Sequence, residues 1–305
     1  MWGGIAGNMR ILLAIVHYWC PEENAGHQSL RANPQPRVEA LQAQLLGLRR
    51  VMGRQGVLNI AERCVQPTNA ELRHSIDIRL ITDGEHHVIE RLAPAYQGLA
   101  DVVITEPSSP RHLGFQAQRY LASQLSAGYD LYGYLEDDLV IHDPMFFSKV
   151  HWIQHQLQQQ AVVLPHRYEL CHQPDPVDKL YIDGPMPAAD LAMLLPDPAP
   201  PVQSQQPGGV IRLESPANPH AGCFFLTAEQ LHHWTQQPCW QDGDCSFVSP
   251  LESAATLGIA RCFQLYKPAL SCASWLELQH WGSGFRCLIG AELSLDPALG
   301  LSADA

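Results

Sequence analysis

The strongest constraint on the fold is an alternation of short apolar runs with longer segments of helical periodicity. The run RILLAIV at 10–16 is typical of a buried strand, and residues 34–56 place Val38, Leu41, Leu45 and Leu48 on one helical face. Further along the chain the same reading predicts strands at 75–84, 100–107 and 130–141, with a helix at 111–129. Strands that alternate with helices predict an α/β fold, with a mixed, mostly parallel sheet flanked by helices.

The second half continues the pattern with fewer helices. It predicts helices at 143–160 and 249–260, a strand at 161–170, a strand followed by a helix at 222–234, and a strand at 261–270. A stretch rich in Pro and Gly, 196–209, is interpreted as a surface loop. We expect one domain over 9–305, preceded by an N-terminal extension, 1–8, and Met9 is an alternative start.

Composition excludes several classes of function. The chain has 19 basic and 31 acidic residues, a net charge of −12, which disfavours nucleic acid as a partner. The sequence has no run of 18 apolar residues, so we expect no transmembrane helix. Peripheral association with a membrane stays open. Nine cysteines, an odd number without a C-x-x-C pair, argue against a disulfide scaffold and a zinc ribbon, so we expect a cytoplasmic protein.

The acidic triplet Glu136-Asp137-Asp138 interrupts an apolar segment, YGYLEDDLVIHDP. Buried carboxylates require a positive partner. The triplet ends a predicted central strand, where open α/β sheets bind ligands. Two or three carboxylates there suit a hard cation such as Mg²⁺ or Mn²⁺. The alternative is that Asp137 or Asp138 pairs with an arginine or caps the next helix.

The segment YDLYGYLEDDLVIHDPMFF resembles the D-x-D region of GT-A-fold glycosyltransferases, with Glu136 in place of the first aspartate. The resemblance implies a GT-A-like, Rossmann-type domain that binds a nucleotide-sugar through 10–165 and an acceptor through 210–290. It implies that Asp138, Glu136 and the late histidine His280 bind Mn²⁺ or Mg²⁺, which holds the donor diphosphate.

Other residues are assigned to the donor and the acceptor. For the nucleotide, the candidates at strand ends and beside the triplet are His17, Tyr18, Asp83, Asp137 and Arg167, with Lys179 and Lys267 as alternatives to Arg167 for phosphate. Arginine suits phosphate because its fork donates two hydrogen bonds. For the acceptor or sugar, the candidates are His220, Gly222 and Trp281. Each of these residues also has an ordinary structural explanation, such as a turn, a surface charge or core packing.

Inversion at the sugar would need a general base that deprotonates the acceptor hydroxyl. Glu252 lies among small and apolar residues, where partial desolvation suits a base. It also fits the first turn of a helix capped by Ser249. Asp244 is the second candidate.

The predicted function is metal-dependent transfer of a sugar from a nucleotide-diphosphate donor to an acceptor hydroxyl on a glycan or small molecule. One alternative is a non-catalytic carbohydrate- or nucleotide-binding protein on the same fold. Another is a metal-dependent nucleotidyltransferase, which the absence of G-x-x-x-x-G-K-[ST] and G-x-G-x-x-G motifs disfavours.

Overall fold

The computed structural model describes residues 8–22, 28–71, 73–171, 177–206, 209–296 and 299. Of the predicted N-terminal extension, only Asn8 falls within these ranges, so that prediction lies outside the described residues.

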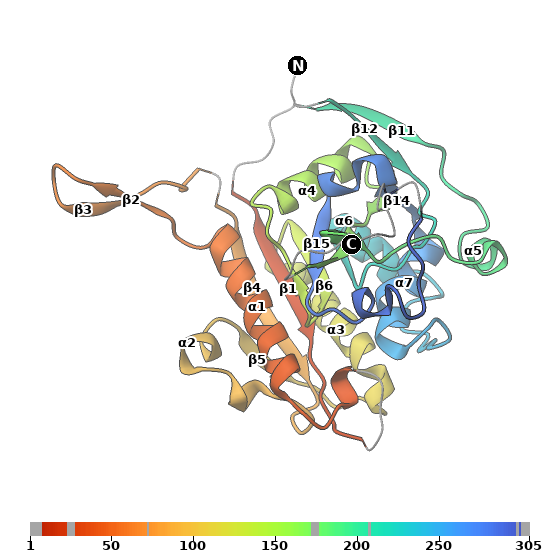
Figure 1. Ribbon diagram of the computed structural model, residues 1–305, viewed down its shortest axis with the longest axis horizontal. Coiled ribbons are helices and arrows are strands. Elements are labelled where there is room, and N and C mark those ends of the chain that lie inside the picture. Colours follow the sequence, from red (N-terminus) through yellow and green to blue (C-terminus); the bar gives the residue numbers. More distant parts are fainter. Residues whose placement is uncertain are drawn as a thin grey trace.

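A five-stranded sheet forms the centre of the molecule (Figure 1). Its order is β13-β6-β1-β4-β5, with β1 at Arg10–Val16, β4 at Ser75–Thr82, β5 at Asp101–Ile104, β6 at Leu131–Glu136 and β13 at Cys223–Thr227. In this sheet β1, β4, β5 and β6 run parallel, and β13 is antiparallel to β6. The predicted α/β class and mostly parallel sheet are confirmed. Residues 11–16 of β1 are almost completely buried, which explains why that strand reads as an uninterrupted apolar run.

Helices surround the sheets, and most of them pack directly on strands. They are α1 (Gln35–Met52), α2 (Pro94–Gln97), α3 (Leu113–Ser123), α4 (Phe146–Gln156), α5 (Ala188–Leu194), α6 (Ala228–Thr235) and α7 (Pro250–Cys262). α1 buries the predicted face of Val38, Leu41, Leu45 and Leu48, and α3 packs on β1, β4 and β6. Short 3₁₀ segments lie at Gln28–Leu30, Ile89–Arg91, Pro110–His112, Leu125–Ala127, Leu270–Trp275 and Arg286–Leu288.

Two smaller sheets of four strands extend the C-terminal half. One has the order β10-β9-β15-β7, with β7 at Leu139–Val140, β9 at His166–Leu170, β10 at Lys179–Tyr181 and β15 at Glu277–His280. The other has the order β11-β12-β14-β8, with β8 at Ala161–Val163, β11 at Val202–Gln206, β12 at Gly209–Glu214 and β14 at Gln264–Pro268.

These sheets correct two predictions. The strand expected at 161–170 is divided at Leu164 and Pro165 into β8 and β9, which join different sheets. The loop expected at 196–209 contains β11 and the first residue of β12, which pair in an antiparallel hairpin. Pairing of β12 with β14 adds this hairpin to a sheet, so tertiary context overrides the weak strand propensity of its Pro- and Gln-rich sequence.

A two-stranded arm projects from the body between α1 and β4 (Figure 1). It consists of β2 (Gly56–Asn59) and β3 (Cys64–Pro67), which pair only with each other. Sequence periodicity does not predict this arm.

All nine cysteines lie in the described part of the chain and are free thiols. Among the described residues, no helix is both long and apolar enough to cross a membrane.

Candidate functional site

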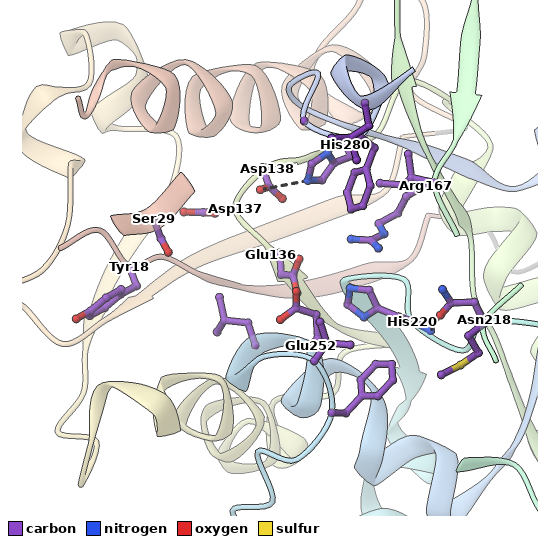
Figure 2. A pocket seen from close by; sticks show the side chains of 18 of the residues that line it. Tyr18, Ser29, Glu136, Asp137, Asp138, Arg167, Asn218, His220, Glu252 and His280 are labelled. Carbon is purple, nitrogen blue, oxygen red and sulfur yellow. Dashed lines mark hydrogen bonds and ion pairs between the residues drawn. The ribbon is translucent and has the colours of Figure 1, made fainter. Parts of the chain in front are cut away.

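A cavity of about 640 Å³ opens at the carboxyl ends of β1 and β6 (Figure 2). These strands are adjacent, and Val16 pairs with Glu136 at their ends. The predicted residues that line the cavity are Tyr18, Glu136, Asp137, Asp138, Arg167, His220, Glu252 and His280. The fold therefore brings together side chains separated by more than 200 positions in sequence.

The three carboxylates of the triplet point in different directions. Asp137 is 3% exposed, and both of its oxygens are used by the protein. Oδ1 accepts a hydrogen bond from Arg37 Nη1, and Oδ2 lies 2.5 Å from His17 Nδ1. His17 Nε2 accepts from the Val88 amide at 3.0 Å, so its Nδ1 carries the proton and donates to Asp137. Burial alone would raise the pKa of Asp137, but the Arg37 charge and the His17 hydrogen bond lower it below its usual value.

Arg37 is the positive partner of the triplet. It lies in the first turn of α1, is 4% exposed, and also reaches Asp138 Oδ2 at 3.3 Å. The alternative in which an acidic residue of the triplet pairs with an arginine therefore holds for Asp137. Sequence analysis did not single out Arg37. The available signal was a charged residue at helical spacing from Leu41 and Leu48, on a face that is apolar apart from Gln44.

Asp138 lies beside His280 in the cavity lining (Figure 2). His280 Nε2 lies 3.7 Å from Asp138 Oδ2, because β7 directly after the triplet pairs with β15 and brings Leu139 opposite His280. The other oxygen, Asp138 Oδ1, is buried and has no hydrogen-bond partner. Asp138 thus lines the cavity and keeps one oxygen that no protein group occupies.

Glu169 on β9 fixes the imidazole of His280. Its Oε1 lies 3.1 Å from His280 Nδ1, and the amides of Phe285 and Arg286 also donate to its carboxylate. Burial tends to raise the pKa of Glu169, but these hydrogen bonds leave it below its usual value. The ionised carboxylate can only accept, so His280 donates from Nδ1, and its Nε2 faces Asp138.

Glu136 points toward Glu252 rather than toward His280 (Figure 2). Burial raises the pKa of Glu136 well above its usual value, and the charges of Glu252 and Asp138 raise it further. Gly222 lies directly behind this side chain. A Cβ at position 222 would approach Glu136 Oε2 to 2.8 Å, and its φ of +63° favours glycine. Gly222 does not line the cavity but makes room for Glu136.

Glu252 lies in the first turn of α7, which begins at Pro250 after Ser249 as predicted. Its Oε2 is buried and has no hydrogen-bond partner. Asp244, the second candidate base, lies outside the cavity lining and pairs with Arg261 at 2.5 Å. Hydrogen bonds from Ser246 and Arg261 lower the pKa of Asp244 to about 2, so it is a weak base. Geometry favours Glu252.

Arg167 brings a buried positive charge to the cavity. Its Nε and Nη2 donate to Asp183 Oδ1 at 2.9 and 2.8 Å. Burial alone would lower the pKa of Arg167, but the charge of Asp183 raises it above the usual value. Asp183 also accepts from Lys267 at 3.0 Å, so one buried carboxylate holds two cations. Asp183 was not predicted, and Lys267 is a buried structural partner here. Lys179 instead pairs with Glu277 at 2.6 Å.

His220 lines the cavity as a neutral imidazole. It is 5% exposed, its Nδ1 lies 3.2 Å from Thr256 Oγ1, and its Nε2 is buried with no hydrogen-bond partner. Burial lowers the pKa of His220 well below its usual value, and the charge of Arg167 lowers it further. The free Nε2 can therefore bond a hydroxyl group without carrying charge.

The remaining predicted residues lie nearer the edge of the site. Tyr18 lines the cavity, and burial raises its pKa to about 12. Asp83 is outside the lining and forms a turn, accepting from the amides of Glu85 and His86 at 3.0 and 2.8 Å. The side chain of Trp281 does not line the cavity either, and its amide donates to the Asp138 carbonyl at 2.7 Å.

The residues of the cavity supply some, but not all, of the ligands that a divalent cation needs. Within the described ranges, no three His, Cys, Asp or Glu side chains converge as a ready-made metal site. Glu136 does not join Asp138 and His280, and Asp137 is fully used by Arg37 and His17. The unpartnered Asp138 Oδ1 and the oriented His280 Nε2 leave two protein ligands, so the remaining ligands would come from a substrate or water.

No protein-family model matches the sequence, and no curated protein matches it. Among solved structures, mannose-1-phosphate geranyltransferase from Thermus thermophilus is similar at 12% identity and a TM-score of 0.38, over 85% of this chain and 73% of that one. A protein of Desulfovibrio desulfuricans described as a nucleotide-diphospho-sugar transferase is similar at 10% identity and a TM-score of 0.41, over 93% and 90% of the chains.

CMP:2-keto-3-deoxy-manno-octonic acid synthetase in complex with CTP is similar at 11% identity and a TM-score of 0.36, over 85% and 89% of the chains. Similarities of this strength carry no argument about the function of this chain. The proposal below therefore depends on the residues of the cavity.

Proposed function

We propose that this protein is a metal-dependent glycosyltransferase that moves a sugar from a nucleotide-diphosphate donor to an acceptor hydroxyl. The observation that supports it most directly is the meeting of three groups in one cavity. These are the free oxygen of Asp138, the oriented Nε2 of His280, and the buried guanidinium of Arg167. Anionic oxygens of a diphosphate are the ligands that would satisfy both a divalent cation and an arginine.

In this proposal Asp138 and His280 hold Mn²⁺ or Mg²⁺ together with the donor. When bound, the cation would neutralise negative charge on the diphosphate leaving group. Arg167 assists from the protein side, because Asp183 holds its Nε and Nη2 in place and so fixes the plane of the guanidinium beside the cavity. Such preorganised charge needs no rearrangement during reaction.

Glu252 acts as the general base in an inverting reaction. Glu252 lines the cavity together with Glu136, its Oε2 has no hydrogen-bond partner, and the raised pKa of Glu136 favours the neutral acid there. A neutral Glu136 avoids the repulsion that two charged carboxylates in one cavity would have. Glu252 removes the proton from the acceptor hydroxyl, and the uncharged His220 Nε2 binds a sugar or acceptor hydroxyl.

The test is a thermal-shift screen of uridine, guanosine, adenosine, cytidine and thymidine diphosphates, with and without Mn²⁺. A ligand at 100 times its dissociation constant stabilises by about 2.7 kcal/mol, which gives a clear shift. We expect one nucleotide to stabilise the protein only with Mn²⁺. Asp138→Asn should remove that shift, whereas Asp101→Asn, a control at a carboxylate whose side chain is 77% exposed, should keep it.

Two results would contradict the proposal. An unchanged nucleotide shift in Asp138→Asn would exclude the cation site at this residue. A shift without release of nucleoside diphosphate from the matching nucleotide-sugar, across a panel of glycan and small-molecule acceptors, would favour a non-catalytic binding protein.

A further inference from the structure

The β2–β3 arm exposes apolar side chains, and its two strands pair only with each other. Along Gly56–Asn59 and Cys64–Pro67 almost every residue is exposed. Val57 is 48% exposed, Leu58 65%, Ile60 at the turn 80% and Val65 73%. A two-stranded hairpin alone in water is at best marginally stable, so such an arm gains from being covered.

The apolar side chains lie on both faces of the arm. Leu58 is directly opposite Val65 in the antiparallel pair, so these two share one face. Val57 is next to Leu58 and therefore points to the opposite face. A protein surface that meets the arm from one side would cover Leu58 and leave Val57 in water. A lipid layer into which the arm inserts would surround both.

The arm and its base are strongly basic in a chain that is otherwise acidic. Residues 49–73 contain five arginines and two glutamates, a net charge of +3, which leaves 14 basic and 29 acidic residues elsewhere, a net charge of −15. The arginines of this segment are Arg49, Arg50, Arg54, Arg63 and Arg73, and all are exposed. In the described part of the chain, none of these side chains forms an ion pair.

Unpaired arginines around an apolar tip match an anionic lipid surface. Each basic residue near such a surface improves binding about fivefold, and the tip adds burial of apolar area. Single-stranded nucleic acid fits less well, because 49–73 contains no aromatic residue on which a base could stack. The acidic remainder of the molecule attracts the arginines of a second copy, but a second copy that met the arm from one side would leave its other apolar face in water.

We propose that the β2–β3 arm is a membrane-docking element that inserts its apolar tip among anionic lipids while the arginines bind the headgroups. This inference does not depend on the proposed enzymatic function, because the arm shares no residue with the cavity.

The test is flotation of the full chain with vesicles. One set contains phosphatidylcholine with phosphatidylglycerol, and the other contains phosphatidylcholine alone. We expect binding to the anionic vesicles, weak binding to the neutral ones, and release in about 1 M salt, where charges are screened beyond about 3 Å. The double variant Arg54→Gln/Arg63→Gln should bind roughly 30-fold more weakly, about fivefold for each arginine.

Leu58→Asn/Ile60→Asn should weaken binding at least about tenfold, because the apolar tip is lost. Ile104→Asn is the matched control, since this side chain is 69% exposed on β5 and away from the arm, and it should bind like the unmodified chain. Size-exclusion chromatography and thermal unfolding of each variant check assembly and folding.

Three results would overturn the inference. They are absence of the unmodified chain from anionic vesicles, equal binding by the tip variant and Ile104→Asn, and a dimer of the unmodified chain that the tip variant dissociates. The last result would assign the arm to an interface between copies.

Discussion

The Nδ1 of His280 lies 3.1 Å from the Oε1 of Glu169, so a completely buried carboxylate holds the imidazole that faces Asp138. Metal-binding histidines in general donate their second ring N–H to a carboxylate or carbonyl group, and this hydrogen bond sets the tautomer and orientation of the imidazole. The pairing of His280 with Glu169 has the same form. The relationship makes Glu169 a positioning residue for the proposed cation.

Glu169→Gln should therefore weaken the affinity for Mn²⁺ by 10- to 100-fold, the usual cost of removing such a contact. The measurement is the Mn²⁺ concentration dependence of the nucleotide-induced thermal shift. At saturating Mn²⁺ we expect the shift to return, because Asp138 and His280 are still present. A loss that no concentration of Mn²⁺ restores would show that Glu169 acts through folding alone.

Arg37 stabilises the fold through the acidic triplet. Arg37→Met leaves Asp137 with His17 as its remaining side-chain partner and should lower the free energy of unfolding by about 3–5 kcal/mol, the typical cost of breaking a buried ion pair. Urea unfolding measures this change. The double variant Arg37→Met/Asp137→Leu removes the uncompensated charge and should recover part of the loss. A single variant within about 1 kcal/mol of the unmodified chain would contradict the assigned role.

Glu252→Gln separates binding from transfer. It should lower kcat by about 100-fold or more, because a general base contributes at least that factor. The nucleotide-induced thermal shift should persist, because Glu252 is not a proposed ligand of the cation. Asp244→Asn should retain transfer, since Asp244 pairs with Arg261 outside the cavity. Equal rates in the two variants would remove Glu252 from the mechanism.

The buried His220 should make the protein less stable in mild acid. Its pKa in the folded chain is well below the ordinary value of about 6.5, so below that pH the unfolded chain binds a proton that the folded chain excludes. Stability therefore falls as pH falls, by about 2 kcal/mol between pH 7 and pH 5. Denaturant unfolding at the two pH values should show this drop, and His220→Asn should reduce it. The same drop in both proteins would assign the effect to other histidines.

The sequence predicts the parallel strands well because their signal is local. The runs that became β1, β4 and β6 are recognisable from apolar composition and turn residues alone. Asp138 and His280 are 142 positions apart, and the pairing of β7 with β15 brings them together, so local sequence patterns could not predict their contact. The family resemblance predicted it instead.

Arg37, Glu169 and Asp183 were not identified for the same physical reason. Each acts through a partner at least 16 positions away in the sequence, and the helix and strand periodicities reveal only neighbours a few positions apart. Arg37 left the clearest trace, a charge on the buried face of α1. The β2–β3 arm left none, because exposed strands lack the alternation of buried and exposed residues that identifies a strand in sequence.

The length of α1 sets the distance between the cavity and the base of the arm. Arg37 in its first turn lines the cavity, and three residues separate Met52 at its other end from the start of the arm. Eighteen helical residues span about 27 Å, which is close to the thickness of a bilayer hydrocarbon core. If the arm is held at a lipid layer and α1 runs along the membrane normal, the cavity stands clear of the layer, and a lipid-linked acceptor would need a polar chain long enough to cover that distance. Small diffusible acceptors would meet no such requirement.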